Sequence, residues 1–301
     1  MTTSSSPAVH PVPTVSWRAY LALCKLRVVG AIVFTAVIGM FLSVPGLPPL
    51  ALSIWAALGI GLAAASAAAL NHIYDREADG KLHRTEYRPL PQHQLEPKQA
   101  NRFAGVLCLL SMMILGFLVN PLTAALTFLS LIGYAVIYTR YLKRITTQNI
   151  VIGGAAGAAP PVLGWCAITG NLDPHSLLLF LLIFVWTPPH FWPLALAKKD
   201  EYKLADMPML PVIYGDALTK LHILLYTILL FISSLLPYLT RMSGLIYLAA
   251  AVILGSGFLY FAIRLKRAPD NKLAMKTFGF SLFYLMGLFS ALLVDHYIYA
   301  G

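Results

Sequence analysis

The sequence predicts an all-α polytopic membrane protein. Of its 301 residues, 58% are hydrophobic and only 11% are charged, whereas about 25% of the residues of an average soluble domain are charged. The apolar residues form nine long continuous runs, which match membrane-spanning helices and exclude the short alternating strands of a β-barrel. So few charges cannot cover a soluble surface, and so high a hydrophobicity excludes a disordered chain.

We expect nine transmembrane helices in a single domain, residues 21–301, preceded by a disordered cytoplasmic tail, residues 1–20. The start of this tail is polar and rich in Ser and Pro, and it lacks the features of a cleavable secretory signal. With edges good to about three residues, the nine runs cover residues 28–44, 50–70, 103–119, 121–138, 150–168, 176–197, 221–240, 243–263 and 277–299.

The basic residues alternate between the connections. If the N-terminus is cytoplasmic, 21 of the 22 Lys and Arg residues lie on the cytoplasmic side and only Arg241 lies outside. This asymmetry follows the positive-inside rule, and nine spans then leave the C-terminus external. The net charge of +10 therefore indicates topology and attraction to anionic lipid, and no nucleic-acid partner is expected. The tail lacks the arginines of a mitochondrial transit peptide, which favours a bacterial inner (plasma) membrane.

Two landmarks recur along the chain at nearly the same spacing. Asp75 and Asp200, in the acidic connections after the second and sixth spans, lie 125 residues apart, and a Leu-Lys-Arg tag beginning at Leu142 recurs after 123 residues. We therefore expect two four-helix repeats, about 21–145 and 146–268, followed by a last helix. Repeats with an even number of spans are parallel, so both acidic segments would face one central cavity. The frequent ending of membrane helices in Lys or Arg explains each tag alone.

The sharpest local pattern, NHIYDREAD, follows the second span. If the helix continues through it, Asn71, Asp75 and Asp79 recur every four residues along one face. Stacked carboxylates repel one another, so compensating cations are expected. Oxygen ligands at the mouth of a cavity suit Mg²⁺, which commonly bridges carboxylates to substrate phosphates. The alternative is a solvated helix end with ordinary surface acids.

Cations follow this acidic stripe directly in GKLHRTEYRPLP. They are Lys81, His83, Arg84 and Arg88. Arginine makes bidentate contacts to phosphate, so carboxylates interleaved with cations indicate a joint site for a metal and an anion. Lys143 and Arg144 supplement this set, or they are positive-inside anchors.

The second acidic segment, residues 198–206, is less regular. It contains Asp200, Glu201 and Asp206 together with Lys203, and the spacing leaves open which acid is a ligand. Two acidic clusters that converge on one diphosphate through Mg²⁺ match the arrangement needed to ionise an allylic diphosphate.

One ionisable residue lies inside the sixth span. His190 occurs in WTPPHFWP, where three prolines free backbone carbonyls of the helix. An intramembrane histidine is a functional candidate by default, as a ligand of haem iron, a group that orients an acceptor, or a base. The alternative, a neutral histidine bonded to a freed carbonyl, stays open.

Together these motifs resemble those of the UbiA-type intramembrane prenyltransferases, and within them the protohaem IX farnesyltransferases (haem O synthases). The stripe is typical of the superfamily, whereas TPPHFW and the NIVIGG…PP…GW run point to the haem branch. The resemblance runs from about Leu21 to the C-terminus. The matching segments are NHIYDREADGKLHRTEYRPLP, YLKRITTQNIVIGGAAGAAPPVLGW, WTPPHFW and PMLPV.

The resemblance implies a helical bundle of UbiA type around a central cavity that faces the cytoplasm. It implies transfer of farnesyl from farnesyl diphosphate to the vinyl group of haem B, giving the haem O of terminal oxidases. It also implies Mg²⁺ as cofactor, the lipid bilayer as environment, and haem-handling or oxidase-assembly proteins as candidate partners.

The same resemblance, joined to the patterns above, assigns the site residues. The catalytic set is Asp75, Asp79 and His190; the diphosphate set is Asn71, Arg84, Arg88, Lys143, Arg144 and Lys203; the metal set is Asp75, Asp79, Asp200 and Glu201; the haem-side candidates are His190 and His72. One departure concerns the second motif, which often reads Asp-x-x-x-Asp in the superfamily. Here Leu204 stands four residues after Asp200, so the metal-binding acid of this segment stays open.

Two other functions compete with haem farnesylation. A UbiA-type transferase with an aromatic, quinone-precursor acceptor would not be expected to carry TPPHFW. A small-solute transporter would place its polar groups near the bilayer midplane at broken helices, whereas these carboxylates fall at cytoplasmic helix ends.

Overall fold

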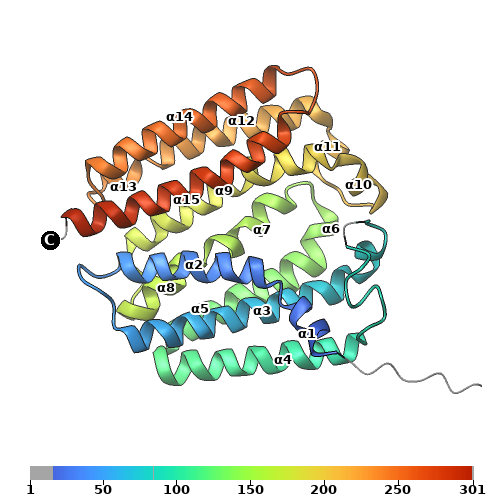
Figure 1. The fold of residues 1–301 in the computed structure, drawn as a ribbon, viewed down its shortest axis with the longest axis horizontal. Helices are drawn as coiled ribbons and strands as arrows, with labels where there is room; N and C mark the ends of the chain where they lie inside the picture. Colours follow the sequence, from blue (N-terminus) through green and yellow to red (C-terminus); the bar gives the residue numbers. More distant parts are fainter. Residues whose placement is uncertain (1–15, 84, 300–301) are drawn as a thin grey trace, which may run out of the picture.

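The apolar runs form long helices that lie side by side and are roughly aligned (Figure 1). The computed structural model describes residues 16–83 and 85–299, and within these residues it contains helices and no strands. Eight of these helices are long and apolar enough to cross a membrane, and a ninth crossing results when α1 and α2, which meet at a 49° bend, count as one span. The prediction of an all-α bundle with nine spans is therefore confirmed.

The first five spans contain eight α-helices or helix fragments and two π-helical segments. They are α1 (Trp17–Leu23), α2 (Leu26–Leu42), α3 (Leu50–Gly80), α4 (Pro97–Ile114), η1 (Leu115–Val119), α5 (Pro121–Ile132), η2 (Gly133–Leu142), α6 (Lys143–Ile145), α7 (Asn149–Ala158) and α8 (Pro160–Thr169), continued by α9 (Pro174–Ala197) as the sixth span. The rest of the chain forms α10 (Lys199–Leu204), α11 (Leu210–Ile213), α12 (Gly215–Ser233), α13 (Leu236–Leu239), α14 (Leu245–Arg267) and α15 (Ala274–Tyr299).

The chain becomes helical earlier than the sequence predicts. Residues 1–15 lie outside the described residues, but α1 begins at Trp17, so the expectation of a disordered tail over 1–20 is wrong at its C-terminal end. The Ser16 hydroxyl caps α1. Leu23 of α1 is fully buried in an apolar cluster with α3 and α4, and this contact orders the segment.

Two glycines let α2 and α8 pack backbone against backbone. A Cβ atom on Gly164 of α8 would lie 1.9 Å from the carbonyl oxygen of Ala36, and one on Gly39 of α2 would lie 2.1 Å from that of Pro161. Small residues at such crossings allow close van der Waals packing where lipid offers no hydrophobic driving force. This contact joins the first span firmly to the fifth and fixes one wall of the interior.

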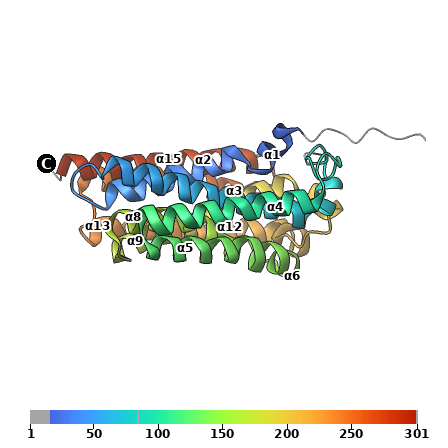
Figure 2. The same ribbon diagram turned by 90° about the horizontal axis from the view of Figure 1, so that it is seen from below.

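The connections rich in Lys and Arg lie at one end of the bundle, beside α1, α6, α10 and α11, and we call this the basic end (Figure 1). At the opposite end of the bundle, beside α13, the last helix, α15, lies next to α2 (Figure 2) and is hydrogen-bonded to α2 and to the residues that follow it. There His296 Nε2 lies 2.9 Å from the carbonyl oxygen of Val44. The Tyr297 hydroxyl donates to the carbonyl oxygen of Phe41 at 3.2 Å. The alternation of connections predicted from charge is thus reproduced in space.

Candidate active site

The acidic stripe lies on a buried face of α3 at the basic end. Helix α3 continues without a break to Gly80, so Asn71, Asp75 and Asp79 follow one another along successive turns. Their exposed fractions are 4%, 3% and 5%. The alternative of ordinary surface acids does not fit this burial, because unpaired buried carboxylates are strongly disfavoured.

Each buried carboxylate has a cation against it. Lys143 Nζ lies 2.6 Å from Asp75 Oδ2, and Arg88 Nη1 lies 2.6 Å from Asp79 Oδ2. The Asn71 amide also donates to Asp75 Oδ2, at 2.8 Å. These cations come from two different connections at the basic end, so the pairs hold both connections over α3.

Local structure explains why Arg88 reaches the stripe. The Thr85 hydroxyl is buried and donates to the carbonyl oxygen of Asp79 at 2.8 Å, so it satisfies one of the free carbonyls at the C-terminus of α3. The chain then turns back along the helix end and brings Arg88 to Asp79. Arg84 and the side chain of Arg144 lie outside what the structure describes.

Lys25 is a member of this cluster that the sequence did not single out. It occupies the bend between α1 and α2 in a left-handed conformation, with φ 48°, and its ammonium group donates to Asn71 Oδ1. By sequence alone it is one of three basic residues before the first span, and the positive-inside rule already explains these. Only the bend, which separates it from the regular helix face, brings it over the stripe.

The second acidic segment approaches the first but does not join the stripe. Asp206 accepts from Lys81 at 3.3 Å, and an apolar cluster joins Ala78 and Leu82 to the residues around α10. The two acidic connections therefore meet over the basic end, as the predicted parallel arrangement requires.

Within that segment the acids have different surroundings. Glu201 pairs with Lys198 at 2.6 Å, while Asp200 and Lys203 are exposed on α10. Neither of these two makes a hydrogen bond or ion pair to the stripe within the described residues. Their assignment to metal and diphosphate stays a prediction.

The donor set suits Mg²⁺ only in part. Within residues 16–83 and 85–299, no group of three or more His, Cys, Asp or Glu side chains could by itself hold a metal ion. Asp75 Oδ1, however, is buried and has no hydrogen-bond partner among the described residues. An orphaned carboxylate oxygen beside a second carboxylate and an amide fits an ion whose remaining ligands come from water and substrate phosphates.

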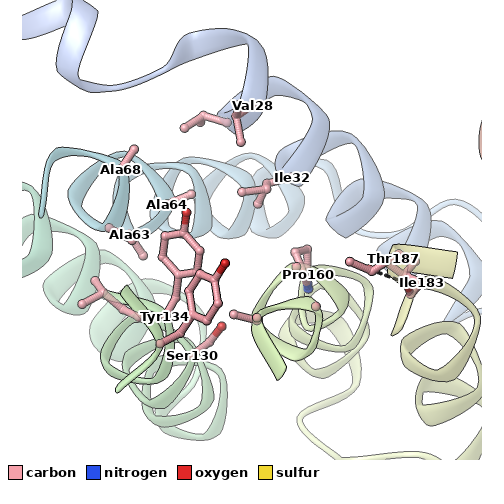
Figure 3. Close-up of a pocket in the computed structure, with 18 of the residues that line it drawn as sticks. Val28, Ile32, Ala63, Ala64, Ala68, Ser130, Tyr134, Pro160, Ile183 and Thr187 are labelled. Carbon is pink, nitrogen blue, oxygen red and sulfur yellow. Dashed lines mark hydrogen bonds between the residues drawn. The ribbon is translucent and has the colours of Figure 1, made fainter. Parts of the chain in front are cut away.

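A cavity of about 310 Å³ extends from the cluster into the bundle. Lys25 lines its charged end, and the remaining wall is formed almost entirely by apolar or small side chains of α2, α3, α5, η2, α7, α8 and α9. Figure 3 shows the cavity bounded by Val28 and Ile32 on one side and by Ala63 and Ala64 of α3 on another. Its volume is in the range of small-ligand sites, and its lining, apolar apart from Lys25 at one end, suits an apolar chain with an anionic head.

His190 lies behind the cavity wall. Its ring is stacked between Trp186 and Phe278, with ring centroids 4.1 and 4.6 Å away, and its Nδ1 lies 2.7 Å from the Ser281 hydroxyl oxygen. Trp186 and Phe191 of the same helix line the cavity, whereas His190 does not. The partner is thus a hydroxyl of α15 rather than a carbonyl freed by proline.

His72, the other haem-side candidate, is 2% exposed, and neither ring nitrogen has a hydrogen-bond partner among the described residues. It interacts electrostatically with Lys25 and Arg88, two cations of the cluster around the stripe. Of these residues Lys25 lines the cavity, whereas His72 does not.

Both the sequence and the fold of this chain match those of known proteins. The model of the UbiA prenyltransferase family matches residues 32–288. The chain belongs to the UbiA prenyltransferase family. The resemblance predicted from the motifs is therefore confirmed at the level of the superfamily.

Curated relatives confirm the branch within this family. Two proteins named protoheme IX farnesyltransferase, from Methylococcus capsulatus and Nitrosococcus oceani, are 68% and 59% identical to the chain. The matches cover 99% and 94% of this chain and 99% and 95% of those proteins. The chain and its relatives therefore correspond over nearly their full lengths.

Solved structures share the fold. A structure described as digeranylgeranylglyceryl phosphate synthase matches with a TM-score of 0.80 at 20% identity, covering 93% of this chain and 98% of that one. A UbiA homologue from Archaeoglobus fulgidus bound to DMAPP and Mg²⁺ matches with a TM-score of 0.62 at 16% identity, covering 91% and 99%. At these identities the matches establish the architecture.

The assignment of the stripe to the catalytic and metal site can be tested by substituting a single carboxylate. Asp75→Asn keeps the shape but removes the charge that pairs with Lys143, and we expect turnover to fall at least ~10-fold, the usual effect of disturbing a metal site. Glu77→Gln is the matched control, because it removes the same charge from the same helix at an exposed position. Turnover and melting temperature are measured for both variants. Turnover of Asp75→Asn within twofold of that of Glu77→Gln would contradict the assignment.

Proposed function

We propose that this chain transfers the farnesyl group of farnesyl diphosphate to the vinyl group of protohaem IX. The observation that carries the proposal is the buried acid–cation cluster, which Lys25 connects to an apolar cavity of about 310 Å³. Its curated relatives, 52–68% identical, are named for this activity. The cluster supplies groups for a diphosphate, and the cavity supplies an apolar site for a prenyl chain.

The diphosphate binds where the cations converge. Lys25, Arg88 and Lys143 donate to its oxygens, and Asn71 adds a neutral amide. Arg84, Arg144 and Lys203 complete the proposed diphosphate set from the surrounding connections. Before the substrate arrives, Arg88 and Lys143 neutralise the carboxylates of the stripe. When the diphosphate binds, each of these cations exchanges its carboxylate for an oxygen of the diphosphate.

Mg²⁺ is the proposed cofactor, held by Asp75 and Asp79, with Asp200 or Glu201 as further ligands from the second segment. Its support in this chain is the orphaned Oδ1 atom of Asp75, and its support in the family is a homologue from Archaeoglobus fulgidus bound to DMAPP and Mg²⁺. When bound, the ion supplies positive charge that stabilises the departing diphosphate.

The transfer then follows from charge separation between the two ends of the site. The C–O bond of the allylic diphosphate breaks, the electron pair leaves with the diphosphate, and the positive charge stays on the farnesyl group in the apolar cavity. The vinyl π electrons of the haem form the new C–C bond. Water captures the resulting cation beside the porphyrin and releases a proton, which gives the hydroxyethylfarnesyl side chain. The apolar wall excludes water from the first cation, which would otherwise be hydrolysed.

The haem-side assignments are refined by the surroundings of the two histidines. His190 is hydrogen-bonded to Ser281 and stacked between aromatic rings. These contacts support a positioning role, in which His190 orients the turn of α9 that carries Trp186 and Phe191. His72 is buried in α3 directly after Asn71 of the stripe, and we keep it as the second haem-side candidate.

The protein is a multi-pass membrane protein, and we propose the bacterial inner membrane as its location. The basic end faces the cytoplasm, so soluble farnesyl diphosphate reaches the cluster from there, and haem-handling or oxidase-assembly proteins are the proposed partners for the acceptor and the product. The support is the 21-to-1 distribution of basic residues.

A reporter fused after Gly301 tests this orientation. With nine spans and a cytoplasmic N-terminus, a reporter that works only outside the cytoplasm should be active, and one that works only inside should be silent. The opposite pattern would mean that the number of crossings or the orientation is wrong.

The activity itself is tested with purified protein, haem B, farnesyl diphosphate and Mg²⁺, followed by chromatography and mass analysis of the haems. We expect haem B to be converted into a more apolar haem whose mass is increased by a farnesyl group and one hydroxyl group, and we expect no conversion when EDTA replaces Mg²⁺. An aromatic quinone precursor is offered in a parallel reaction. Prenylation of that acceptor with haem left unchanged, or undiminished haem prenylation in EDTA, would contradict the proposal.

A further inference from the structure

The fourth span changes its winding where it passes the cavity. Helix α5 ends at Ile132, and the next ten residues, Gly133–Leu142, form the π-helix η2. π-Helical segments are rare and are frequently found at functional sites. This one carries two aromatic residues, Tyr134 and Tyr138, that both line the cavity.

The winding determines which side chains share a face. Tyr134 and Lys143 are nine residues apart, which is about two and a half turns of an α-helix and would set them on opposite faces. In a π-helix the hydrogen bonds join residues five apart instead of four, so each turn holds more residues, and the same nine residues make about two full turns. The π-helix therefore turns Tyr134, Tyr138 and the cation that pairs with Asp75 toward the same side.

Several contacts fix this geometry. The Thr139 hydroxyl donates to the carbonyl oxygen of Tyr134 at 2.8 Å, five residues back, and accepts from the Asn71 amide at 3.5 Å. The two tyrosine rings are stacked, with centroids 5.6 Å apart and planes 27° apart. Gly153 of α7 makes room for them, because a Cβ atom there would lie 2.5 Å from the Tyr138 ring.

Figure 3 shows the Tyr134 ring reaching from η2 into the cavity toward Ala63 and Ala64 of α3. Asn71 and Asp75 stand two to three turns further along the same helix, toward its charged end. Tyr138 lies about one turn nearer that end than Tyr134, on the way to Lys143, which pairs with Asp75. A prenyl chain whose diphosphate is held there therefore passes Tyr138 first and Tyr134 beyond it.

We propose that Tyr134 and Tyr138 are catalytic residues whose ring faces stabilise the positive charge on the allylic carbons. The inference rests on the proposed function, because that charge arises when the C–O bond of the prenyl diphosphate breaks and the electron pair leaves with the diphosphate. The rings form no bond and take no proton. Their electron-rich faces attract a cation, and the attraction is larger in a dry cavity than at an exposed site. The charge passes on when the acceptor's π electrons form the new bond.

The test uses a trialkylammonium analogue of the farnesyl cation and its neutral carbon isostere, each offered with inorganic diphosphate and Mg²⁺. We expect the wild-type protein to bind the ammonium analogue about 5- to 30-fold more tightly than the isostere. Tyr134→Phe and Tyr138→Phe should keep this preference, since the ring remains. Tyr134→Leu and Tyr138→Leu should lose most of it and turn over at least ~10-fold more slowly, while still binding the isostere.

A matched control comes from α9, where Phe180 and Phe184 form another stacked pair with four-residue spacing that does not line the cavity. Phe184→Leu removes a stacked ring of the same kind and should leave the ammonium preference unchanged. If a leucine variant does not fold, fluorinated phenylalanines at position 138 replace it. These keep the size of the ring and weaken its electron-rich face, so the preference should fall stepwise with each fluorine.

Three results would overturn the proposal. The first is equal loss of affinity for both analogues in the leucine variants, which would mean that the rings only shape the cavity. The second is loss of the preference in the phenylalanine variants, which would assign the effect to the hydroxyls. The third is an unchanged preference across the fluorinated series. The analogues need no haem, so a protein that prenylates another acceptor would fail the proposed function and still pass this test.

Discussion

The structure depends on neutralising two buried carboxylates. Asp75 and Asp79 are 3% and 5% exposed, and a charge removed from water to this extent is tolerated only when it is paired and hydrogen-bonded. The partners, Lys143 and Arg88, belong to connections that are distant in sequence, so the requirement for pairing also folds these connections over the end of α3. Removal of one partner leaves the other charge buried and unpaired, which is why the cluster behaves as a unit. The same pairs keep cations at the site where a diphosphate needs them.

The rest of the molecule supplies the opposite environment. Alanines of α3 and glycines of α7 leave a cavity that larger side chains would fill, and close packing of α2 on α8 closes one of its walls. An apolar site strengthens each electrostatic contact at its edge, because little water screens it. Charge separation is therefore favoured along one direction, with the anion drawn to the cations and the allylic cation left among apolar and aromatic groups. This separation of a charged end from an apolar interior fits a bundle of membrane helices, because polar groups can gather only where the membrane ends.

Sequence patterns predicted the spans and the stripe because both have a regular period. Apolar runs of spanning length and acids repeating every four residues are properties of a regular α-helix, and α3 is regular to Gly80. Lys25, Tyr134 and Tyr138 were not predicted, because a left-handed residue at a bend and a π-helix both break that period. His190 lies inside the sixth span, α9, but its partner, Ser281 on α15, is 91 residues away, and no local pattern reveals such a contact. The pairing of Arg88 with Asp79 could be anticipated from charge, whereas its geometry depends on the Thr85 turn.

In this mechanism the internal cations hold the cluster ready for a diphosphate, so that metal and diphosphate bind together. Calorimetric titration of Mg²⁺ into the purified protein, with and without a non-ionising thiodiphosphate analogue of farnesyl diphosphate, tests it most directly. After correction for Mg²⁺ bound by the free analogue, we expect weak binding of Mg²⁺ to the protein alone and at least ~10-fold tighter binding when the analogue is present. Linkage requires the analogue to bind more tightly with Mg²⁺ by the same factor. Equal Mg²⁺ affinity in both titrations would contradict the account.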